Sequence, residues 1–383
     1  MDEQTENVSA AIIGTGFMGR VHAEALRRLR IPIAGILGST PQKSRSAAQE
    51  LGIPQAYDSL DDLLNDPAVT AIHINTPNRQ HYDMARRAIA ANRHVMCEKP
   101  LAMTSEESRA LVQLASEHPQ LVTGVNYNIR FYPLMQEMRA RLQSKRIFHM
   151  TGSYVQDWLL HATDYNWRVL AEEGGALRAV ADIGTHWLDL IQHVSGLQVC
   201  AVCADLQTVH ATRYRPQGEV RTFSRESSVN TTSVPITTDD AGTILLRFSN
   251  GSRGSLHVSQ VTAGRKNCLQ FHIATEDDSL AWNSEQPNQL WLGHRGRPNE
   301  ILLKDPSLLT ERAAACADNP GGHNEGFADT FKQCFAAFYQ QIAAPTAGQS
   351  TAFASFADGH REIVLCETIL ASHQKQTWLE VTD

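Results

Sequence analysis

The chain of 383 residues lacks an excess of positive charge, with a formal net charge of -7 and no cluster of lysine and arginine. Nucleic acids and anionic membrane surfaces are recognised through such clusters, so both are disfavoured as partners. No uninterrupted apolar run reaches the roughly 18 residues that a membrane helix needs. The acidic residues 1–6 also lack the basic and apolar segments of an ordinary secretory signal. We therefore expect neither a nucleic-acid-binding nor a membrane protein.

Cysteine is sparse, and its seven copies are scattered and odd in number. This usage suits reduced thiols and predicts a cytoplasmic protein without a disulfide framework. Cys200 and Cys203 form a C-x-x-C, but in a strand this spacing points them to opposite faces, which predicts core residues rather than a redox or zinc pair. Internal repeats and low-complexity tracts are also missing. The length is sufficient for two domains.

A glycine-rich hexapeptide follows the first predicted strand, residues 8–13, and precedes a helical pattern. A G-x-G-x-x-G between a strand and a helix is typical of dinucleotide binding, because the glycines permit a tight turn and the helix N-terminus faces the pyrophosphate. The alternative is a purely structural glycine turn. The cofactor contacts predicted here are Gly14, Gly16, Phe17, Met18 and Gly19.

Strands and helices continue to alternate, with further strands predicted at residues 31–37, 69–75, 94–97 and 121–126. This alternation predicts an α/β domain over residues 1–127, a Rossmann-type doubly wound parallel sheet. Ligands of such sheets bind beyond the carboxyl ends of the strands. The further cofactor contacts expected at that edge are Thr76, Pro77, Asn78, His81, Glu98 and Lys99.

The remaining residues, 128–383, have a different pattern. Long alternating segments at residues 147–158, 199–214, 242–248, 254–261 and 269–275 predict an open, predominantly antiparallel sheet with flanking helices. The polar stretch 215–240 is expected to be a long loop or sheet insertion. We therefore predict a second, α+β domain that binds substrate and mediates oligomerisation.

One predicted helix, residues 181–193, carries four titratable groups along one stripe: Asp182, His186, Asp189 and His193. A carboxylate one turn before an imidazole can fix its tautomer and tune its proton affinity. Two other interpretations stay open: a solvated polar face, and a metal site, since i, i+4 pairs can chelate. Lys99, at a strand end before a proline, could stabilise a substrate oxygen as hydride leaves, or could be an ordinary surface lysine.

Taken together, the glycine turn, Thr76-Pro77-Asn78 with His81, Glu98-Lys99-Pro100 and Asp182-x-Gly184-x-His186-x-x-Asp189 resemble the Gfo/Idh/MocA family of sugar and cyclitol dehydrogenases. The resemblance covers essentially the whole chain. It implies that Lys99, Asp182 and His186 are catalytic, that the helix works without a metal, and that the back of the second sheet forms a homodimer or homotetramer interface.

The residues 165–168 and 321–327 resemble a subgroup that handles monosaccharides, cyclitols or anhydrosugars. A tryptophan face can stack on sugar C–H groups while arginine and histidine bind hydroxyls. The substrate contacts this implies, beside Asp182 and His186, are Tyr132, Trp167, Arg168 and His323. For the aromatic residues, a place in the core is the alternative.

The expected reaction is an NAD(P)-dependent oxidation of a secondary hydroxyl of a sugar-like substrate, or reduction of the ketone. His186 would be the general acid/base, Asp182 would orient it or bind a hydroxyl, and Lys99 would polarise the oxygen. Two alternatives are a glycoside-cleaving enzyme that oxidises its sugar transiently with bound NAD, and a non-catalytic sugar or nucleotide sensor. Retention of all three residues argues against the sensor.

The choice between NAD and NADP depends on the end of the second strand. NAD-specific sites place an acid there to hold the ribose hydroxyls, but this strand ends in Gly38. Ser39 and Thr40 offer hydroxyls instead, and Lys43 and Arg45 lie near the expected position of a 2′-phosphate. We predict use of both cofactors with a modest preference for NADP; a permissive NAD site is the alternative.

Overall fold

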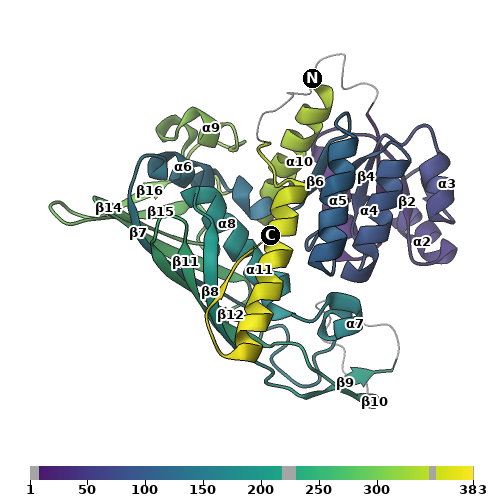
Figure 1. Ribbon diagram of the computed structural model, residues 1–383. Helices are drawn as coiled ribbons and strands as arrows, with labels where there is room; N and C mark the ends of the chain where they lie inside the picture. The colour runs from purple at the N-terminus through teal and green to yellow at the C-terminus, as the bar shows by residue number, and fades with distance from the viewer. Residues whose placement is uncertain (1–7, 218–229, 345–350, 383) are drawn as a thin grey trace. The chain divides into compact units, whose positions relative to one another are not determined.

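A computed structural model describes residues 8–217, 230–344 and 351–382. The opening residues 1–6 and part of the predicted polar loop 215–240, residues 218–229, lie outside this part of the chain. The chain divides into two compact units: Met1–Asn128 with Ala328–Ile363, and Ile129–Phe327 with Val364–Asp383. Figure 1 labels the helices and strands. Among the described residues, no helix is long and apolar enough to cross a membrane.

The first unit is built on a parallel six-stranded sheet of order β3-β2-β1-β4-β5-β6, which confirms the predicted doubly wound fold. Its central strands β1 and β4 are buried throughout and, apart from His73 in β4, apolar, because helices cover both faces. β3 was not predicted, since it is only three residues long. The strands are β1 (Ala10–Ile13), β2 (Ile33–Leu37), β3 (Gln55–Tyr57), β4 (Ala71–Ile74), β5 (His94–Cys97) and β6 (Thr123–Val125).

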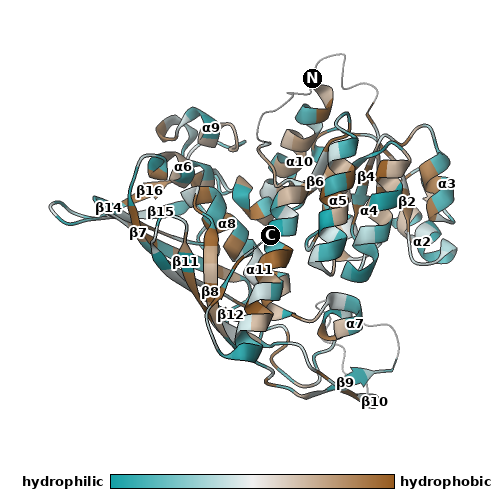
Figure 2. Ribbon diagram, viewed as in Figure 1, coloured by the Kyte–Doolittle hydropathy of each residue, from teal (hydrophilic) through white to brown (hydrophobic). Residues whose placement is uncertain are grey.

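Hydroxyl side chains begin three of the first unit's helices. The oxygens of Thr40, Ser59 and Thr104 each accept a hydrogen bond from the backbone N–H three residues on, at 3.1–3.2 Å. Along α4 and α5 hydrophilic and hydrophobic stretches alternate, as expected of helices that pack one face on a sheet (Figure 2). The helices are α1 (Phe17–Arg28), α2 (Pro41–Leu51), α3 (Leu60–Asn65), α4 (His81–Ala90) and α5 (Ser105–Glu117).

Helix α10 (Phe327–Ala343) packs on the first unit, although the sequence placed residues 128–383 in one domain. The Phe335 ring lies 4.7 Å from the rings of both His22 and His73. Ala354 forms a β-bridge with Val125 in the same unit. These contacts join residues more than 200 positions apart, which no local pattern predicts.

The second unit contains a nine-stranded sheet of order β16-β15-β14-β13-β7-β12-β11-β8-β17. Every pair is antiparallel except β7 with β12, which confirms the predicted α+β class. Helices α6 (Pro133–Leu142) and α8 (Thr185–Ser195) pack on one face, around a fully buried Trp187.

The strands of this sheet are β7 (Ile147–Val155), β8 (Val199–Gln207), β11 (Ala241–Phe248), β12 (Arg253–Ser259), β13 (Cys268–Thr275), β14 (Asp278–Asn283), β15 (Gln289–His294), β16 (Glu300–Leu303) and β17 (Leu379–Glu380). The ends of the predicted polar loop form a separate pair, β9 (Thr212–Pro216) with β10 (Thr231–Pro235). The chain also contains two short helices, α7 (Ala171–Gly174) and α9 (Glu311–Ala314), and the long helix α11 (Phe356–Lys375).

Candidate functional site

The glycine turn after β1 leaves room for a ligand at one of its three glycines. Gly14 has φ +108, and a Cβ on it would lie 2.5 Å from the carbonyl oxygen of Asn75. A Cβ on Gly19 would lie 2.1 Å from the carbonyl oxygen of Gly14. At Gly16 nothing lies within 4 Å, and the first turn of α1 carries no acidic residue. An open approach to a helix N-terminus without negative charge fits the pyrophosphate of a dinucleotide.

The end of β2 has no acidic residue for a packing reason. A Cβ on Gly38 would lie 2.9 Å from the backbone nitrogen of Ser44, so no side chain fits there. Thr40 was predicted to contact the cofactor. Its hydroxyl oxygen accepts a hydrogen bond from the backbone N–H of Lys43. Arg45 forms an exposed ion pair with Asp58 at 2.9 Å.

His81, predicted to contact the cofactor, is buried between two loops. Its Nδ1 lies 2.7 Å from the carbonyl oxygen of Pro100 and its Nε2 lies 2.9 Å from that of Thr76. Burial lowers the pKa of the imidazole, although both hydrogen bonds oppose this effect. His81 therefore joins the loop after β4 to the loop after β5.

Glu98 and Lys99 follow β5 directly, and the Glu98 side chain faces the interior. Its Oε1 accepts hydrogen bonds from His22 Nε2 at 3.0 Å and from Asn126 Nδ2 at 2.5 Å. Burial alone would raise the pKa of this carboxyl, but the hydrogen bond from His22, the charge of Lys99 and the hydrogen bond from Asn126 lower it below its usual value. Lys99 is only partly buried at the carboxyl edge of the sheet.

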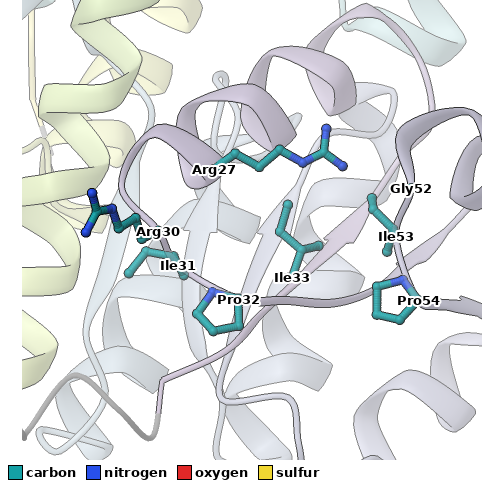
Figure 3. Close-up of a pocket in the computed structure, with 8 residues that line it drawn as sticks. All are labelled: Arg27, Arg30, Ile31, Pro32, Ile33, Gly52, Ile53 and Pro54. Carbon is teal, nitrogen blue, oxygen red and sulfur yellow. The ribbon is translucent and has the colours of Figure 1, made fainter.

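A cavity of about 300 Å³ lies elsewhere on this unit, between the end of α1, the start of β2 and the residues after α2 (Figure 3). It adjoins the amino end of β2, whereas the glycine turn lies at the carboxyl end of β1. The cavity is therefore separate from the predicted cofactor site. Its lining residues are Arg27, Arg30, Ile31, Pro32, Ile33, Gly52, Ile53 and Pro54.

In the second unit, Asp182 lies in a π-helical turn, Val180–Gly184, and His186 lies in the first turn of α8. The predicted continuous α-helix thus begins with a wider turn, a form common at functional sites. The Asp182 carboxylate accepts a hydrogen bond from Gln260 Nε2 at 2.8 Å, and its other oxygen lies 3.4 Å from Arg168 Nε. The His186 ring lies 6.3 Å from the ring of Tyr154.

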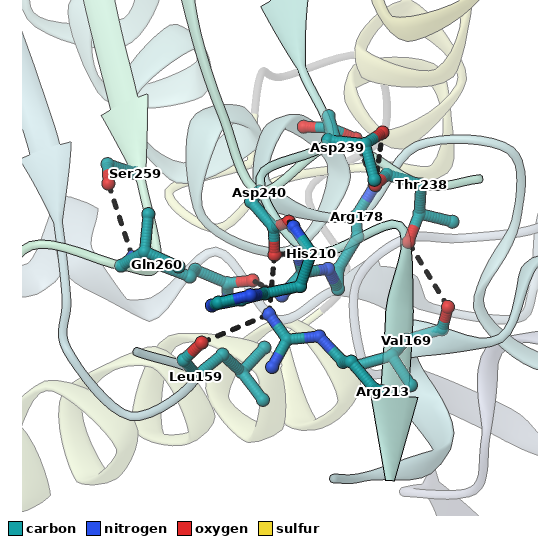
Figure 4. A network of polar contacts seen from close by, with 12 residues as sticks. Leu159, Val169, Arg178, His210, Arg213, Thr238, Asp239, Asp240, Ser259 and Gln260 are labelled. Atoms are coloured by element: carbon teal, nitrogen blue, oxygen red, sulfur yellow. Dashed lines mark hydrogen bonds and ion pairs between the residues drawn. The ribbon is translucent and has the colours of Figure 1, made fainter. Parts of the chain in front are cut away.

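A buried ionic network supports this turn (Figure 4). The carboxylate of Asp239 accepts the N–H groups of Arg178 at 2.6 Å and of Val180 at 2.9 Å, and so caps the turn. Arg178 and Arg213 both pair with Asp240. Burial would raise the pKa of Asp240, but the two guanidinium groups and a backbone N–H lower it below its usual value.

The network also orients the amide that holds Asp182. Arg178 Nη1 donates to Gln260 Oε1 at 3.2 Å, which leaves Nε2 of the same amide to donate to Asp182. Asp182 is therefore positioned through Gln260 by a cluster of fixed charges.

The other half of the predicted polar stripe has a structural role. Asp189, which is 3% exposed, accepts hydrogen bonds from Arg130, including one from Nε at 2.8 Å. His193 Nδ1 lies 2.9 Å from Arg139 Nη1. Burial and these arginines hold the pKa of His193 well below its usual value. This half of the stripe, Asp189 and His193, is thus not a solvated face, and the arginines already occupy the side chains that a cation would need.

The predicted substrate residues differ in their surroundings. The Arg168 guanidinium lies 4.4 Å from the centre of the Trp167 ring, so both belong to one surface with Asp182. Tyr132 is buried, with its ring 5.2 Å from that of Trp282, so it packs in the core.

His323 is exposed, on a loop shaped by a buried lysine. Lys304 Nζ donates to the carbonyl oxygens of Asn319 at 3.0 Å, Pro320 at 3.3 Å and His323 at 2.7 Å. Glu325 Oε2 lies 3.8 Å from the same nitrogen. The loop is thus wrapped around one ammonium group.

Several polar residues beside Asp182 were missed in the sequence. Asn267 Oδ1 accepts from Tyr154 Oη and Gln156 Nε2, both at 2.7 Å, and Gln156 Oε1 accepts from Trp158 Nε1 at 2.8 Å. Gln156 and Gln260 directly follow β7 and β12, which pair in parallel and so end at the same edge. That placement was the available signal, but it required the parallel pairing to be known.

Comparison with known proteins agrees with this architecture. A family profile described as "Oxidoreductase family, NAD-binding Rossmann fold" matches residues 8–127, and one described as "GFO/IDH/MocA C-terminal domain" matches residues 135–281. A levoglucosan dehydrogenase of Pseudarthrobacter phenanthrenivorans is 26% identical over 402 residues, covering 98% of both chains.

Two solved structures extend the comparison. One is a levoglucosan dehydrogenase in complex with NADH and L-sorbose, with TM-score 0.86, 25% identity and coverage of 98% of this chain and 99% of that one. The other is an inositol dehydrogenase homolog complexed with NAD+ from Azotobacter vinelandii. It has a TM-score of 0.84 and 22% identity, and the match covers 97% of each chain. At this identity the match supports a shared fold and nothing more specific.

Proposed function

Because the chain belongs to the Gfo/Idh/MocA family of oxidoreductases, we propose that it transfers hydride between a nicotinamide cofactor and a secondary hydroxyl or ketone of a sugar-like substrate. The observation that carries the proposal is the Asp182 carboxylate, held by Gln260 and Arg168 one turn before His186. The full-length likeness to a levoglucosan dehydrogenase supports monosaccharides, cyclitols and anhydrosugars as the substrate class.

The residues have distinct roles in this proposal. Bound nicotinamide supplies a hydride acceptor or donor, so the hydroxyl proton has to be handled by the protein. His186 takes that proton in oxidation and returns it in reduction, and Asp182 orients the imidazole or a substrate hydroxyl. Lys99 stabilises negative charge on the reacting oxygen.

Substrate recognition is assigned to Trp167, Arg168 and His323, with the amide groups beside Asp182 as further contacts. The burial of Tyr132 gives it a supporting role in the core. His81 and Glu98 act on cofactor binding by holding the loops that carry Thr76 and Lys99.

A dehydrogenase screen over cyclitols, aldoses and anhydrosugars with NAD and NADP tests the function. Lys99→Ala and His186→Ala should each lower kcat by at least about 100-fold, as loss of a general acid/base does. The controls His118→Ala and Lys375→Ala remove the same residue types elsewhere. Undiminished turnover in both Lys99→Ala and His186→Ala contradicts the assignment.

The same screen separates the two rival functions. Sugar cleavage without net appearance of reduced cofactor indicates a glycoside-cleaving enzyme that oxidises its substrate transiently. Tight binding of a sugar or nucleotide without any turnover indicates a sensor.

For the cofactor, we propose use of both NAD and NADP with a modest preference for NADP. The absence of an acid at Gly38 supports this, because no carboxylate repels a 2′-phosphate. Lys43 and Arg45, which pairs with Asp58, are the two cations to test. Lys43→Ala and Arg45→Ala should each raise the KM for NADP, by about threefold to tenfold, and leave the KM for NAD unchanged. A more than tenfold preference for NAD without effect of either substitution contradicts the preference.

We also propose a cytoplasmic homodimer or homotetramer formed through the open face of the second sheet. Trp291, Ile301 and Leu245 lie on that face by strand register, and the last two are 52% and 47% exposed. Trp291 and Ile301 line a groove of about 420 Å³ that also includes His272. Ile301→Lys should shift the sedimentation coefficient towards the monomer. The seven free cysteines support the cytoplasmic location.

A further inference from the structure

A chain of four buried polar side chains runs through the first unit and ends beside Lys99. Tyr339 Oη lies 2.9 Å from His73 Nε2, His73 Nδ1 lies 3.0 Å from His22 Nδ1, and His22 Nε2 lies 3.0 Å from Glu98 Oε1. All four residues are buried. They come from α10, β4, α1 and the end of β5, so the chain connects elements far apart in the sequence.

The partners give this chain one direction. An ionised Glu98 only accepts, so His22 Nε2 donates to it. We assign a neutral imidazole to His22 as part of this inference; it then accepts at Nδ1, while His73 donates from Nδ1 and accepts at Nε2. Tyr339 donates its hydroxyl proton to His73. Each of these contacts is a formed hydrogen bond in this pattern, with no charged imidazole.

Two observations support an ionised Glu98 and a neutral His73. Asn126 donates to the same Glu98 oxygen, which favours the carboxylate. Burial, together with His22, holds the pKa of His73 well below its usual value, so His73 stays neutral at pH 7.

The chain also fixes the backbone from which Lys99 extends. Glu98 and Lys99 are consecutive residues directly after β5, so the segment that carries the held Glu98 side chain also carries Lys99. The N–H of Glu98 donates to the carbonyl of Ile74, which holds the backbone on the sheet. A Glu98 side chain held inward therefore fixes the start of the Lys99 side chain, and its negative charge, one residue away, interacts with the lysine.

We propose that His22, His73 and Tyr339 are positioning residues for Lys99, acting through the Glu98 carboxylate. This inference rests on the proposed role of Lys99 in the reaction. The three residues do not touch substrate or cofactor; they hold the anion that sets the position of the lysine.

The first test does not depend on activity. Nitrogen NMR of ¹⁵N-histidine-labelled full-length protein should show His22 with its proton on Nε2 and His73 with its proton on Nδ1. After ¹³C-methylation of lysines, the Lys99 signal, assigned by its loss in Lys99→Arg, should shift in His22→Leu and in Tyr339→Phe. The matched control Tyr57→Phe removes another buried hydroxyl of this unit, which donates to Asp66, and should leave the signal unmoved.

The second test uses kinetics. His22→Leu and Tyr339→Phe should lower kcat by about tenfold and about threefold, with the KM for the cofactor unchanged within twofold, because a small displacement of a catalytic group slows the chemical step. Unchanged NADH binding and thermal unfolding exclude a general loss of structure.

The outcomes separate the two proposals. The opposite tautomers, or a Lys99 signal that moves equally in Tyr57→Phe, overturn the positioning role. So does a kcat equal to that of Tyr57→Phe in both variants. A fully active Lys99→Ala overturns instead the proposed role of Lys99, while the NMR signals still decide whether the chain holds it.

Discussion

Each unit of the protein has a buried polar network beside a proposed catalytic residue, and the two networks are built differently. The first unit uses neutral imidazoles, a phenol and one carboxylate, next to Lys99. The second uses two guanidinium groups around one carboxylate, and reaches Asp182 through Gln260. In a chain of hydrogen bonds each group has a fixed role as donor or acceptor, so the chain determines which atom holds a proton. Ion pairs determine only where the charges lie.

This difference predicts how each network responds when one of its residues is replaced. Removing one partner of a buried ion pair leaves an uncompensated charge in a low-dielectric interior. Removing one neutral member of a hydrogen-bonded chain leaves only an unpaired dipole, which is less costly. Replacing a residue of the ionic network should therefore lower the stability of the second unit. Replacing a residue of the hydrogen-bonded chain should mainly change the orientation of side chains in the first unit.

The largest expected effect follows removal of the shared carboxylate. Asp240→Asn leaves Arg178 and Arg213 buried without a counter-charge and should lower the free energy of unfolding by about 3–5 kcal/mol. Denaturation by urea, followed by circular dichroism, measures this change. The control Asp58→Asn breaks the exposed pair with Arg45 and should cost less than about 1 kcal/mol.

The substitution Arg213→Met tests whether the balance of charges or the packing of the arginine side chain holds the ionic network together. It leaves Asp240 paired one-to-one with Arg178, so it should cost less than Asp240→Asn. An equal or larger loss of stability would show that the packing of Arg213, and not the charge balance, holds the network.

A smaller effect is expected where the ionic network reaches the site. Gln260→Leu removes the donor to Asp182 and should lower kcat about tenfold, because the carboxylate loses its fixed position. Gln113→Leu removes an exposed amide of α5, which donates to Glu117 and lies outside the proposed site, and serves as the control. Steady-state kinetics with a substrate found in the screen measure both, and equal effects on the two variants contradict the positioning of Asp182 by Gln260.

The smallest effect is a difference in pH dependence between the networks. His73 has a strongly lowered pKa in the folded protein, so the unfolded chain binds that proton first. Stability is therefore complete above the ordinary histidine pKa of about 6.5 and falls below it, by up to about 1.4 kcal/mol per pH unit. The carboxyl of Asp240, whose pKa is lowered, loses its contribution only at pH values below about 4.

Urea denaturation at pH 7.0, 6.0 and 5.5 measures this slope. His73→Phe should reduce it, whereas replacing the exposed His161 by Asn should not. An unchanged slope in His73→Phe means that His73 takes up its proton in the folded state.

Local sequence signals predicted much of the first unit. The glycine turn, the strand-helix alternation and the helix from Pro41 to Leu51 are confirmed, because each depends on residues adjacent in the chain. The family and the two fold classes are confirmed as well. The residue roles at Lys99, Asp182 and His186 stay predictions.

What the sequence did not predict depends on long-range contacts. The π turn at Val180–Gly184 looks like ordinary helix until Asp239, which caps it, is placed beside it. Asp189 and His193 have the spacing of a functional stripe, but arginines from α6 and its N-terminal flank engage them. Gln260 can be assigned to the site only when the parallel pairing of β12 with β7 is known.

The buried lysine under the His323 loop has a consequence for the conditions in which the protein keeps its shape. Its ammonium occupies the centre of three carbonyl oxygens, a place that many loops fill with a captured metal ion. Here the cation is part of the chain, so the shape of the loop is insensitive to chelators and to the salts in the medium. The same arrangement makes the loop depend on a single amine, since acetylation of Lys304 during synthesis would remove both its charge and its donors.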